Sequence, residues 1–350
     1  MSSEPSSTIN FAAIAASWED TDTSTHLAAL DEDSVIGAIR KLAPSGANGN
    51  DAAAINLANG VVGTDMAVEG RHFLRHYSTP RQVGAKVVVQ NLADIVAMGG
   101  TPTAITMALG APGTTPLRVI EDLTRGVTDS LAPAKAELIG GDLTKSQQLV
   151  LSVTAMGHLH GAPLGFNANS ARATPLAKGH IIMSGVLGHS GLGLALLTAL
   201  SHKAQDKSVD FPSYCQQFID DHRVPRLDTT VGASAAHGGV LALTDCSDGF
   251  IRDAGTLAKH SHLTIDLTNP WVNDAVKEDF SAACAFAGVT PEDMILSGGE
   301  DHCLLGIIDE HTPVPPGFRI IGNVWSSDQP RILYNGKETT AHRYWESFRS

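Results

Sequence analysis

Residues 61–110 read VVGTDMAVEGRHFLRHYSTPRQVGAKVVVQNLADIVAMGGTPTAITMALG, and this stretch decides the fold. Its first residues are β-branched and apolar, which predicts a strand that ends near Asp65. Residues 82–98 predict a helix, which the glycine pair at 99–100 should stop. A second strand is expected at 104–110. A strand, a helix and a strand in this order indicate layered packing of helices on a sheet.

The same pattern continues outward along the chain. Residues 117–131 predict a helix, and the runs AELIGGD and LVLSVTAMGHL predict strands. Gly, Asn, Ser and Pro are frequent at 161–175, which predicts a linker, and strands alternate with helices again after it. With 350 residues, 43% of them hydrophobic, the chain can form two cores. We therefore predict a two-domain α/β (α+β) fold, with an N-terminal domain at 31–162 and a C-terminal domain at 176–350.

The first thirty residues differ in composition from the rest. They are rich in Ser, Thr, Asp and Glu and show no regular apolar period, so we predict a mobile extension at 1–30. The folded part is expected to begin with a helix at 32–42, where apolar residues recur at helical spacing. Residues 1–28 should then be dispensable for stability and activity.

The chain is acidic, with 24 Lys and Arg against 37 Asp and Glu, and its net charge is −13 with His neutral. Such a charge opposes binding to nucleic acid and to anionic membranes. The sequence has no membrane-length apolar run and no secretory signal, which predicts a cytoplasmic protein. The four cysteines have no zinc-like spacing and are expected to be reduced. If the substrate is a phosphate, a divalent cation must be imported to hold it.

Several carboxylates stand beside glycine at the ends of apolar, β-rich runs. They are Asp65 in VVGTD, Asp142 in AELIGGD, Asp245 and Asp248 in LALTDCSDG, and Glu300 in ILSGGED. Asp51 follows a Gly-Asn turn, and Asp94 lies three residues after Asn91 on the same helix face. A single Asp beside Gly is most often a turn or a cap. The repetition of this pattern favours a binding role, because a strand end is a rigid mount for a ligand-binding group.

Convergence of these acids would demand cations. Two carboxylates ~4 Å apart repel by about 4 kcal/mol at an effective dielectric near 20. Lys and Arg are nearly absent from the motifs, so the opposite charge must come from outside the chain. Carboxylate oxygens select Mg²⁺ or Ca²⁺, and Mg²⁺ is usually bound together with phosphates. The glycine-rich run GVLGHSG at 185–191 is compatible with phosphate binding and equally with a plain strand-to-helix turn.

Seven motifs together resemble those of thiamine-monophosphate kinase, a family in the superfamily of aminoimidazole ribonucleotide synthetase and selenophosphate synthetase. They are GNDAAAI (49–55), VVGTDMAVEGRHF (61–73), QNLADIVAMGGTPTA (90–104), IGGDLT (139–144), LTDCSDGF (243–250), LSGGEDHCLL (296–305) and IGNV (321–324). The resemblance runs from about residue 32 to the C-terminus. It implies direct, in-line transfer of a phosphoryl group from ATP to thiamine phosphate, assisted by Mg²⁺. It also implies a homodimer in which the N-terminal mixed sheet pairs with its twin, with nucleotide and metals between the domains.

The resemblance also implies roles for individual residues. Several Mg²⁺ ions are expected at the carboxylates and at neighbouring backbone or hydroxyl oxygens of Asp51, Gly63, Thr64, Asp65, Asp94, Asp142, Asp245 and Asp248. Of these, Asp65, Asp94 and Asp248 are expected to act in catalysis. ATP contacts are expected at Gly141, Arg172 and Ser247, and thiamine-phosphate contacts at His72, Glu300 and Trp345. The chain departs from the family at Asn50, where a second acid is usual, so a neighbouring metal should bind more weakly.

Two other interpretations remain open at the level of sequence. The chain could be a different ATP-dependent enzyme of the same superfamily, although no Cys precedes Cys215, whereas a selenophosphate synthetase is expected to have one near its N-terminus. It could also be a non-catalytic nucleotide-binding relative that kept the scaffold. Turnover of ATP with thiamine phosphate separates these possibilities.

Overall fold

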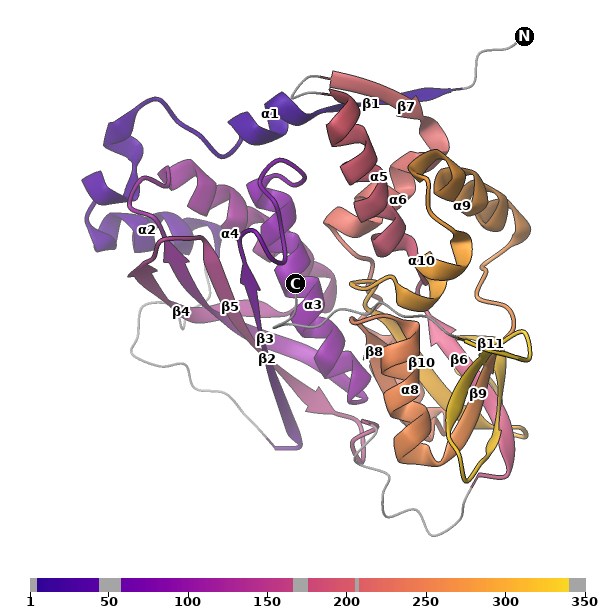
Figure 1. Cartoon of the computed structure of the whole chain (residues 1–350). Helices are drawn as coiled ribbons and strands as arrows, with labels where there is room; N and C mark the ends of the chain where they lie inside the picture. The colour runs from indigo at the N-terminus through magenta and orange to yellow at the C-terminus, as the bar shows by residue number, and fades with distance from the viewer. Residues whose placement is uncertain (1–4, 44–57, 166–175, 205–207, 340–350) are drawn as a thin grey trace.

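Two β-sheets, one in each half of the chain, set the architecture (Figure 1). The structure is a computed structural model that describes residues 5–43, 58–165, 176–204 and 208–339. Both sheets carry helices, which confirms the predicted α/β (α+β) class. The sheets lie within the predicted ranges 31–162 and 176–350. The domain boundaries themselves stay a prediction, because the N-terminal segment and Tyr77 pack into the C-terminal core.

The N-terminal sheet has four strands in the order β2-β5-β3-β4. Their bounds are β2 Gly60–Val68, β3 Gly100–Ala111, β4 Glu137–Lys145 and β5 Val150–Leu159. Strand β5 is antiparallel to both of its neighbours, and β3 is parallel to β4, to which helix α4 (Leu117–Leu131) leads. On β5 the alternate residues Leu151, Val153 and Ala155 are fully buried, which identifies the face that packs on helices.

Helix α3 (Pro80–Ala97) packs on that face and also contacts β8, α6 and α7 of the C-terminal half. Its start is fixed by Thr79, which forms a capping box with Gln82. The helix is apolar on most of its surface because it is covered from both sides. Gly84 lets it approach α4 closely, since a Cβ there would lie 2.1 Å from the Leu123 carbonyl oxygen.

The C-terminal sheet has seven strands in the order β13-β12-β9-β11-β6-β10-β8, and all adjacent pairs except β12 and β9 are antiparallel. Its strands are β6 Lys178–Ser184, β8 Ala242–Cys246, β9 Leu263–Leu267, β10 Cys303–Asp309, β11 Arg319–Ser326, β12 Arg331–Tyr334 and β13 Lys337–Glu338. The helices of this half are α5 His189–Ala204, α6 Gln216–Arg223, α7 Val231–His237, α8 Phe250–Ser261, α9 Asp274–Ala287 and α10 Pro291–Ser297.

The N-terminal segment is part of the folded body, which corrects the predicted mobile extension at 1–30 for the described residues. Strand β1 (Ser6–Asn10) pairs with β7 (Ser208–Pro212), and helix α1 (Phe11–Ala16) follows it. The segment then crosses to the N-terminal half through two 3₁₀ turns, Thr23–Thr25 and Leu27–Ala29, and enters α2 (Glu32–Leu42) (Figure 1).

The buried apolar residues that hold this segment in place lie on a strand, a helix and a loop. Ile9 is on the strand, Phe11 and Ile14 are on the helix, and Trp18 is in the loop, and all four are buried. The first three belong to the core of the C-terminal half, whereas Trp18 belongs to that of the N-terminal half. No single period connects them, and for that reason the sequence pattern did not reveal them.

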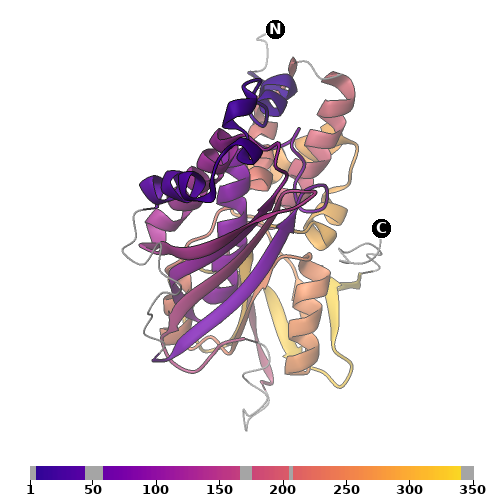
Figure 2. The same ribbon diagram turned by 90° about the vertical axis from the view of Figure 1, so that its left-hand side faces the viewer.

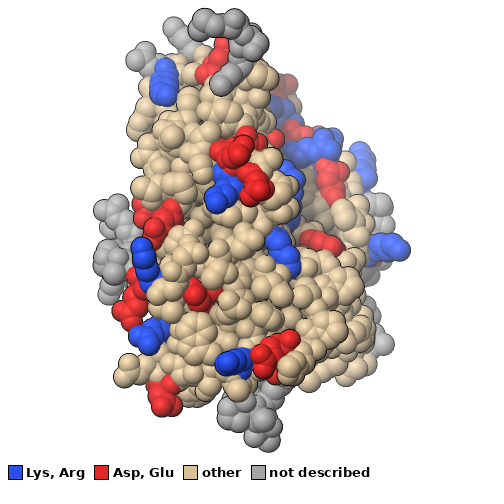
Figure 3. Space-filling model, turned by 90° about the vertical axis from the view of Figure 1, so that its right-hand side faces the viewer, with Lys and Arg blue, Asp and Glu red and all other residues tan. Residues whose placement is uncertain are grey.

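Two surface properties bear on the sequence predictions. On the face of the C-terminal half seen in Figure 3, acidic and basic side chains are interspersed, and neither sign forms a continuous area. Among the helices of the described segments, none combines the length and the apolar character that a membrane crossing requires.

Candidate active site

The predicted acids of the N-terminal half lie where β2 meets α3. Asp65 points to the helix face of β2, where the Gln90 side chain donates a hydrogen bond of 2.9 Å to its carboxylate. The Asp65 main-chain N–H donates to the Asn91 side chain at 3.0 Å, so α3 fixes both ends of this residue. Gly63 lies beside Asp94, since a Cβ on Gly63 would be 3.5 Å from the Asp94 carboxylate.

The acids of the C-terminal half lie at the end of β8 and in the loop that follows it. Asp245 is in β8, and its carboxylate lies 3.3 Å from Nδ1 of His302. Asp248 pairs with Arg252 at 3.1 Å, and its main-chain N–H donates to Asp253 at 2.9 Å. Two basic side chains, Arg252 and His302, therefore already contact the C-terminal acids.

The two groups of acids face each other across the boundary between the halves. Burial, followed by the charges of Asp245 and Asp65, raises the pKa of Asp94 to about 7. Burial also raises the pKa of Asp65, and Asp245 adds to this rise although Gln90 opposes it. The pKa of Asp248 is raised by burial, against Arg252, and further by Asp245 and Asp65. Four predicted carboxylates are therefore near enough to repel one another.

His302 is a buried basic side chain inside this cluster. The side chain is 2% exposed. Burial lowers its pKa, but the hydrogen bond and the charge of Asp245, with a contribution from Glu300, outweigh burial, and the net direction is upward. Protonated His302 in turn lowers the pKa values of Asp65, Asp94 and Asp248.

The carboxylate oxygens of this cluster fit a hard divalent cation whose remaining ligands come from the substrate. In the described segments no three His, Cys, Asp or Glu side chains are grouped tightly enough to hold an ion alone. Mg²⁺ does not require such a group, because it is usually held by one or two carboxylates together with phosphate oxygens and water. Carboxylates whose pKa values are raised by burial and further by one another's charge gain most from an added cation.

Two of the residues predicted on the substrate side, His72 and Glu300, lie beside this cluster. His72 is close enough to Asp65 to affect its pKa, and its Nδ1 accepts a hydrogen bond of 3.1 Å from the Val68 main chain. Glu300 lies in the loop between α10 and β10, where its main-chain N–H donates to the Ser247 carbonyl at 2.7 Å. The Glu300 carboxylate is 2.8 Å from Lys86 Nζ of helix α3. The loop of Ser247 and Asp248 therefore packs directly on the loop of Glu300.

The structure does not bring every predicted residue to this cluster. The Thr64 hydroxyl points to the other face of β2, where it donates to the Val153 carbonyl at 2.9 Å. Asp142 pairs with Ala108 next to the inward-facing Leu109–Leu143 pair, so alternation places its exposed side chain on the outer face. Strand β4 is three positions from β2 in the sheet, a separation of roughly 14 Å. Neither Asp142 nor the adjacent Gly141 can reach the cluster of its own chain.

Gly141 has a structural reason to be glycine, because a Cβ there would lie 2.1 Å from the Met107 carbonyl oxygen. The predicted residues Asp51, Arg172 and Trp345, and also Asn50, lie outside the described residues.

Sequence reasoning missed several residues that the structure places at the site. Lys86 and Gln90 were not named, although they precede Asp94 by eight and four residues, a spacing that puts all three on one helix face. His302 and Asp253 also lie at the site and were not predicted from the sequence. Burial, followed by the charge of Asp245, raises the pKa of Asp253 to about 7. A lysine inside the apolar run AKVVV was the available signal, because a charged residue there needs a buried partner.

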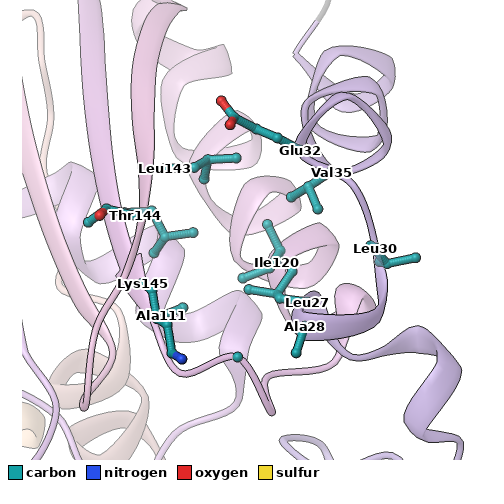
Figure 4. Close-up of a pocket in the computed structure, with 12 residues that line it drawn as sticks. Leu27, Ala28, Leu30, Glu32, Val35, Ala111, Ile120, Leu143, Thr144 and Lys145 are labelled. Carbon is teal, nitrogen blue, oxygen red and sulfur yellow. The ribbon is translucent and has the colours of Figure 1, made fainter.

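A separate cavity of about 420 Å³ lies at the other side of the N-terminal half (Figure 4). Leu27 and Ala28 of the N-terminal segment and Val35 of α2 face Leu143 and Lys145 of β4 across it. Its lining residues come from the N-terminal segment, β3, α4 and β4, so it does not include the carboxylate cluster.

Comparison with known proteins first defines the class of this fold. The family model for the N-terminal domain of AIR synthase related proteins matches residues 49–159, which include β2, α3, β3, β4 and β5. The chain is also similar to the solved structure of AaThiL complexed with AMPPCP and TMP. The TM-score is 0.71 at 27% identity, over 91% of this chain and 97% of that chain.

Two curated relatives narrow the class to a particular family. The chain is 38% identical over 324 residues to the thiamine-monophosphate kinase of Corynebacterium glutamicum, covering 91% of this chain and 94% of the relative. It is 36% identical over 302 residues to the thiamine-monophosphate kinase of Mycobacterium tuberculosis, covering 86% and 85%. The chain belongs to the thiamine-monophosphate kinase family, which confirms the resemblance found in its motifs.

Proposed function

We propose that this chain transfers the γ-phosphoryl group of ATP to the terminal phosphate of thiamine phosphate, giving ADP and thiamine diphosphate. The observation that carries the proposal is the meeting of Asp65 and Asp94 with Asp245 and Asp248 between the two halves of a member of this family. The solved relative complexed with AMPPCP and TMP supports the choice of nucleotide and acceptor.

Phosphoryl transfer between these two substrates requires neutralisation of negative charge rather than a strong general base. The attacking oxygen belongs to a phosphate that is already anionic, so no side chain has to remove a strongly held proton. Mg²⁺, when bound, supplies the positive charge that offsets the approach of two polyanions and the charge of the transition state. Asp65, Asp94 and Asp248 are the residues that would hold it, with Asp245 held in place by His302.

Orientation comes from the residues behind the carboxylates. Gln90 and Asn91 fix Asp65 from one helix, so its carboxylate direction follows that of α3. On the acceptor side, His72 and Glu300 border the same cluster and are proposed to contact thiamine phosphate. We also propose that Trp345 contacts thiamine phosphate and that Arg172 and Ser247 contact ATP.

A homodimer through the outer face of the four-stranded sheet is part of the proposal. In Figure 2 this sheet is turned to the viewer, and over most of its length no described helix lies in front of it. Val62 and Met66 on this face are 64% and 51% exposed. Pairing of two such faces would remove apolar surface from water and would place Gly141 and Asp142 at the subunit boundary. A cytoplasmic location also stays a prediction.

The test is direct assay of purified protein with ATP and thiamine phosphate, with thiamine diphosphate quantified by chromatography. Turnover should require Mg²⁺ or Mn²⁺ and should disappear in excess EDTA. Asp65→Asn and Asp248→Asn should lose activity while keeping the wild-type melting temperature or raising it. Asp129→Asn is the matched control, because Asp129 is an exposed acid paired with Arg81 on the helix surface. Full turnover in EDTA would refute the metal role, and no turnover under any condition would favour a non-catalytic relative.

A further inference from the structure

One face of helix α3 carries three polar side chains that lie at the boundary between the halves. Lys86, Gln90 and Asp94 are spaced by four residues, so they lie one above the other along the helix. Gln90 holds Asp65, and Asp94 belongs to the carboxylate cluster. The proposed function accounts for these two residues and gives no part to Lys86.

Lys86 makes a long-range contact with the acceptor side of the site. Its Nζ is 2.8 Å from Oε2 of Glu300, which is 214 residues further along the chain. The lysine side chain is 8% exposed and that of Glu300 is 31% exposed. The carboxylate is therefore the member of the pair that solvent and substrate can reach, and the lysine lies behind it.

The surroundings of Glu300 indicate that its position is imposed. Its backbone φ is +63°, in the left-handed region that costs a residue with a Cβ energy, so neighbouring contacts must hold it there. Burial would raise the pKa of Glu300, but the charge and the hydrogen bond of Lys86 outweigh burial and bring the pKa to about 2. His222 Nδ1 is 3.9 Å from the carboxylate and 3.0 Å from the Ser190 hydroxyl. Glu300 thus stays ionised and fixed in one place.

We propose that Lys86 is a positioning residue for thiamine phosphate: it holds the Glu300 carboxylate at a fixed height on helix α3, two turns from Asp94. This inference rests on the proposed function. Eight residues of helix span about 12 Å, so α3 fixes the distance between the acceptor-binding carboxylate and a metal-binding carboxylate. Without the pair, Glu300 would no longer be tied to the helix that carries Asp94, and the acceptor phosphate would lose its register with ATP.

The experiment compares Lys86→Met, Lys86→Arg, Glu300→Gln and the double variant Lys86→Met/Glu300→Gln with wild type. Lys86→Met should raise the KM for thiamine phosphate or lower kcat so that kcat/KM falls by about 100-fold, the cost expected for a displacement near 1 Å. The KM for ATP should stay unchanged. Lys86→Arg, which keeps a cation on a long side chain, should recover most of the loss. Arg81→Met is the control, because it removes an exposed cation from the same helix.

The double variant separates positioning from folding. It removes both charges and leaves no unpaired ion in the interior, so it should fold even where Lys86→Met does not. If Lys86 acts through Glu300, the two substitutions should be non-additive, and the double variant should be no worse than Glu300→Gln alone. Additive losses would overturn the proposal, and so would equal losses in the KM for ATP and for thiamine phosphate.

Binding of thiamine without its phosphate distinguishes the proposal from direct contact between Lys86 and the phosphate. Calorimetry should show that Lys86→Met weakens binding of thiamine and of thiamine phosphate alike. A loss confined to thiamine phosphate would overturn the positioning role. Absence of turnover in the wild type refutes the proposed function, whereas an active wild type with an equally active Lys86→Met refutes this inference alone.

Discussion

Trp18 gives the sharpest test of whether the N-terminal segment belongs to the folded body. Its indole ring is 2% exposed and stacks on Phe73, with ring centroids 6.1 Å apart and planes 11° apart. The indole N–H donates to the Ser78 carbonyl at 2.9 Å, and the guanidinium carbon of Arg75 lies 5.2 Å from the ring centroid. All three partners lie between β2 and α3, in the loop that carries His72.

Trp18→Ala should lower the free energy of unfolding by about 3–5 kcal/mol, the usual range for truncating a buried tryptophan. That is a large share of the roughly 5–15 kcal/mol that keeps a folded domain stable. With an m-value of about 3 kcal/mol per M, the urea midpoint should fall by at least about 1 M. Circular dichroism through a urea titration measures the midpoint.

Trp18→Phe separates packing from hydrogen bonding. It keeps an aromatic ring on Phe73 but loses the bond to the Ser78 carbonyl, worth about 1 kcal/mol, and part of the buried ring volume, so its cost should lie between about 1 kcal/mol and that of Trp18→Ala. Deletion of residues 1–19 removes Ile9, Phe11 and Ile14 as well, and should destabilise more than Trp18→Ala. If the deleted chain unfolds at the wild-type midpoint, the packing argument is wrong and the segment is dispensable as its composition first indicated.

Asp94→Asn should raise the melting temperature in EDTA, because it removes a charge that repels Asp65 and Asp245, and it should abolish turnover; a lower melting temperature would contradict the repulsion. The pKa values of about 7 for Asp94 and Asp253 lie above their ordinary value of 3.8, so the folded chain binds more protons than the unfolded chain between these limits. Stability in EDTA should therefore fall as pH rises from about 4 to about 7, and Mg²⁺ should reduce that fall; thermal melts across this range, with and without the ion, test both signs. Met66→Asp should shift the protein to a monomer in light scattering, whereas Val272→Asp, at a similarly exposed position in the C-terminal half, should not.

The carboxylate cluster could largely be predicted from the sequence because its signals are local. An acid near glycine at the end of an apolar run is visible in a few residues, as at Asp245 and Asp248. Asp65 instead lies inside β2, which continues past the predicted strand end to Val68. Helix α3 was predicted at 82–98 from its composition and the stop at Gly99, and the structure moves its start to Pro80, after the Thr79 cap. What the pattern did not show is which faces the acids share, because that depends on the order of strands in the sheet.

Asp142 illustrates this limit. Its motif has the same form as that of Asp65, yet β4 lies at the sheet edge opposite β2 and presents the side chain to the outer face. The pairing of Lys86 with Glu300 was equally hidden, since the two residues are 214 positions apart and belong to different halves. Long-range contacts of this kind have no signature in local spacing.

Each half of the chain provides part of the carboxylate cluster, so the distances within the site depend on how the two halves pack against each other. Repulsion among the acids acts to open that boundary as long as no cation is bound. Contacts that cross it must resist this tendency: the Tyr77 hydroxyl donates to the Thr198 hydroxyl at 3.3 Å, Arg223 donates to the Tyr77 carbonyl at 2.8 Å, and Lys86 pairs with Glu300. Only the last of these contacts includes a residue proposed to touch the substrate. A weakened Tyr77 contact should therefore reduce stability and the affinity for Mg²⁺ together, whereas a weakened Lys86 contact should act first on the binding of the acceptor.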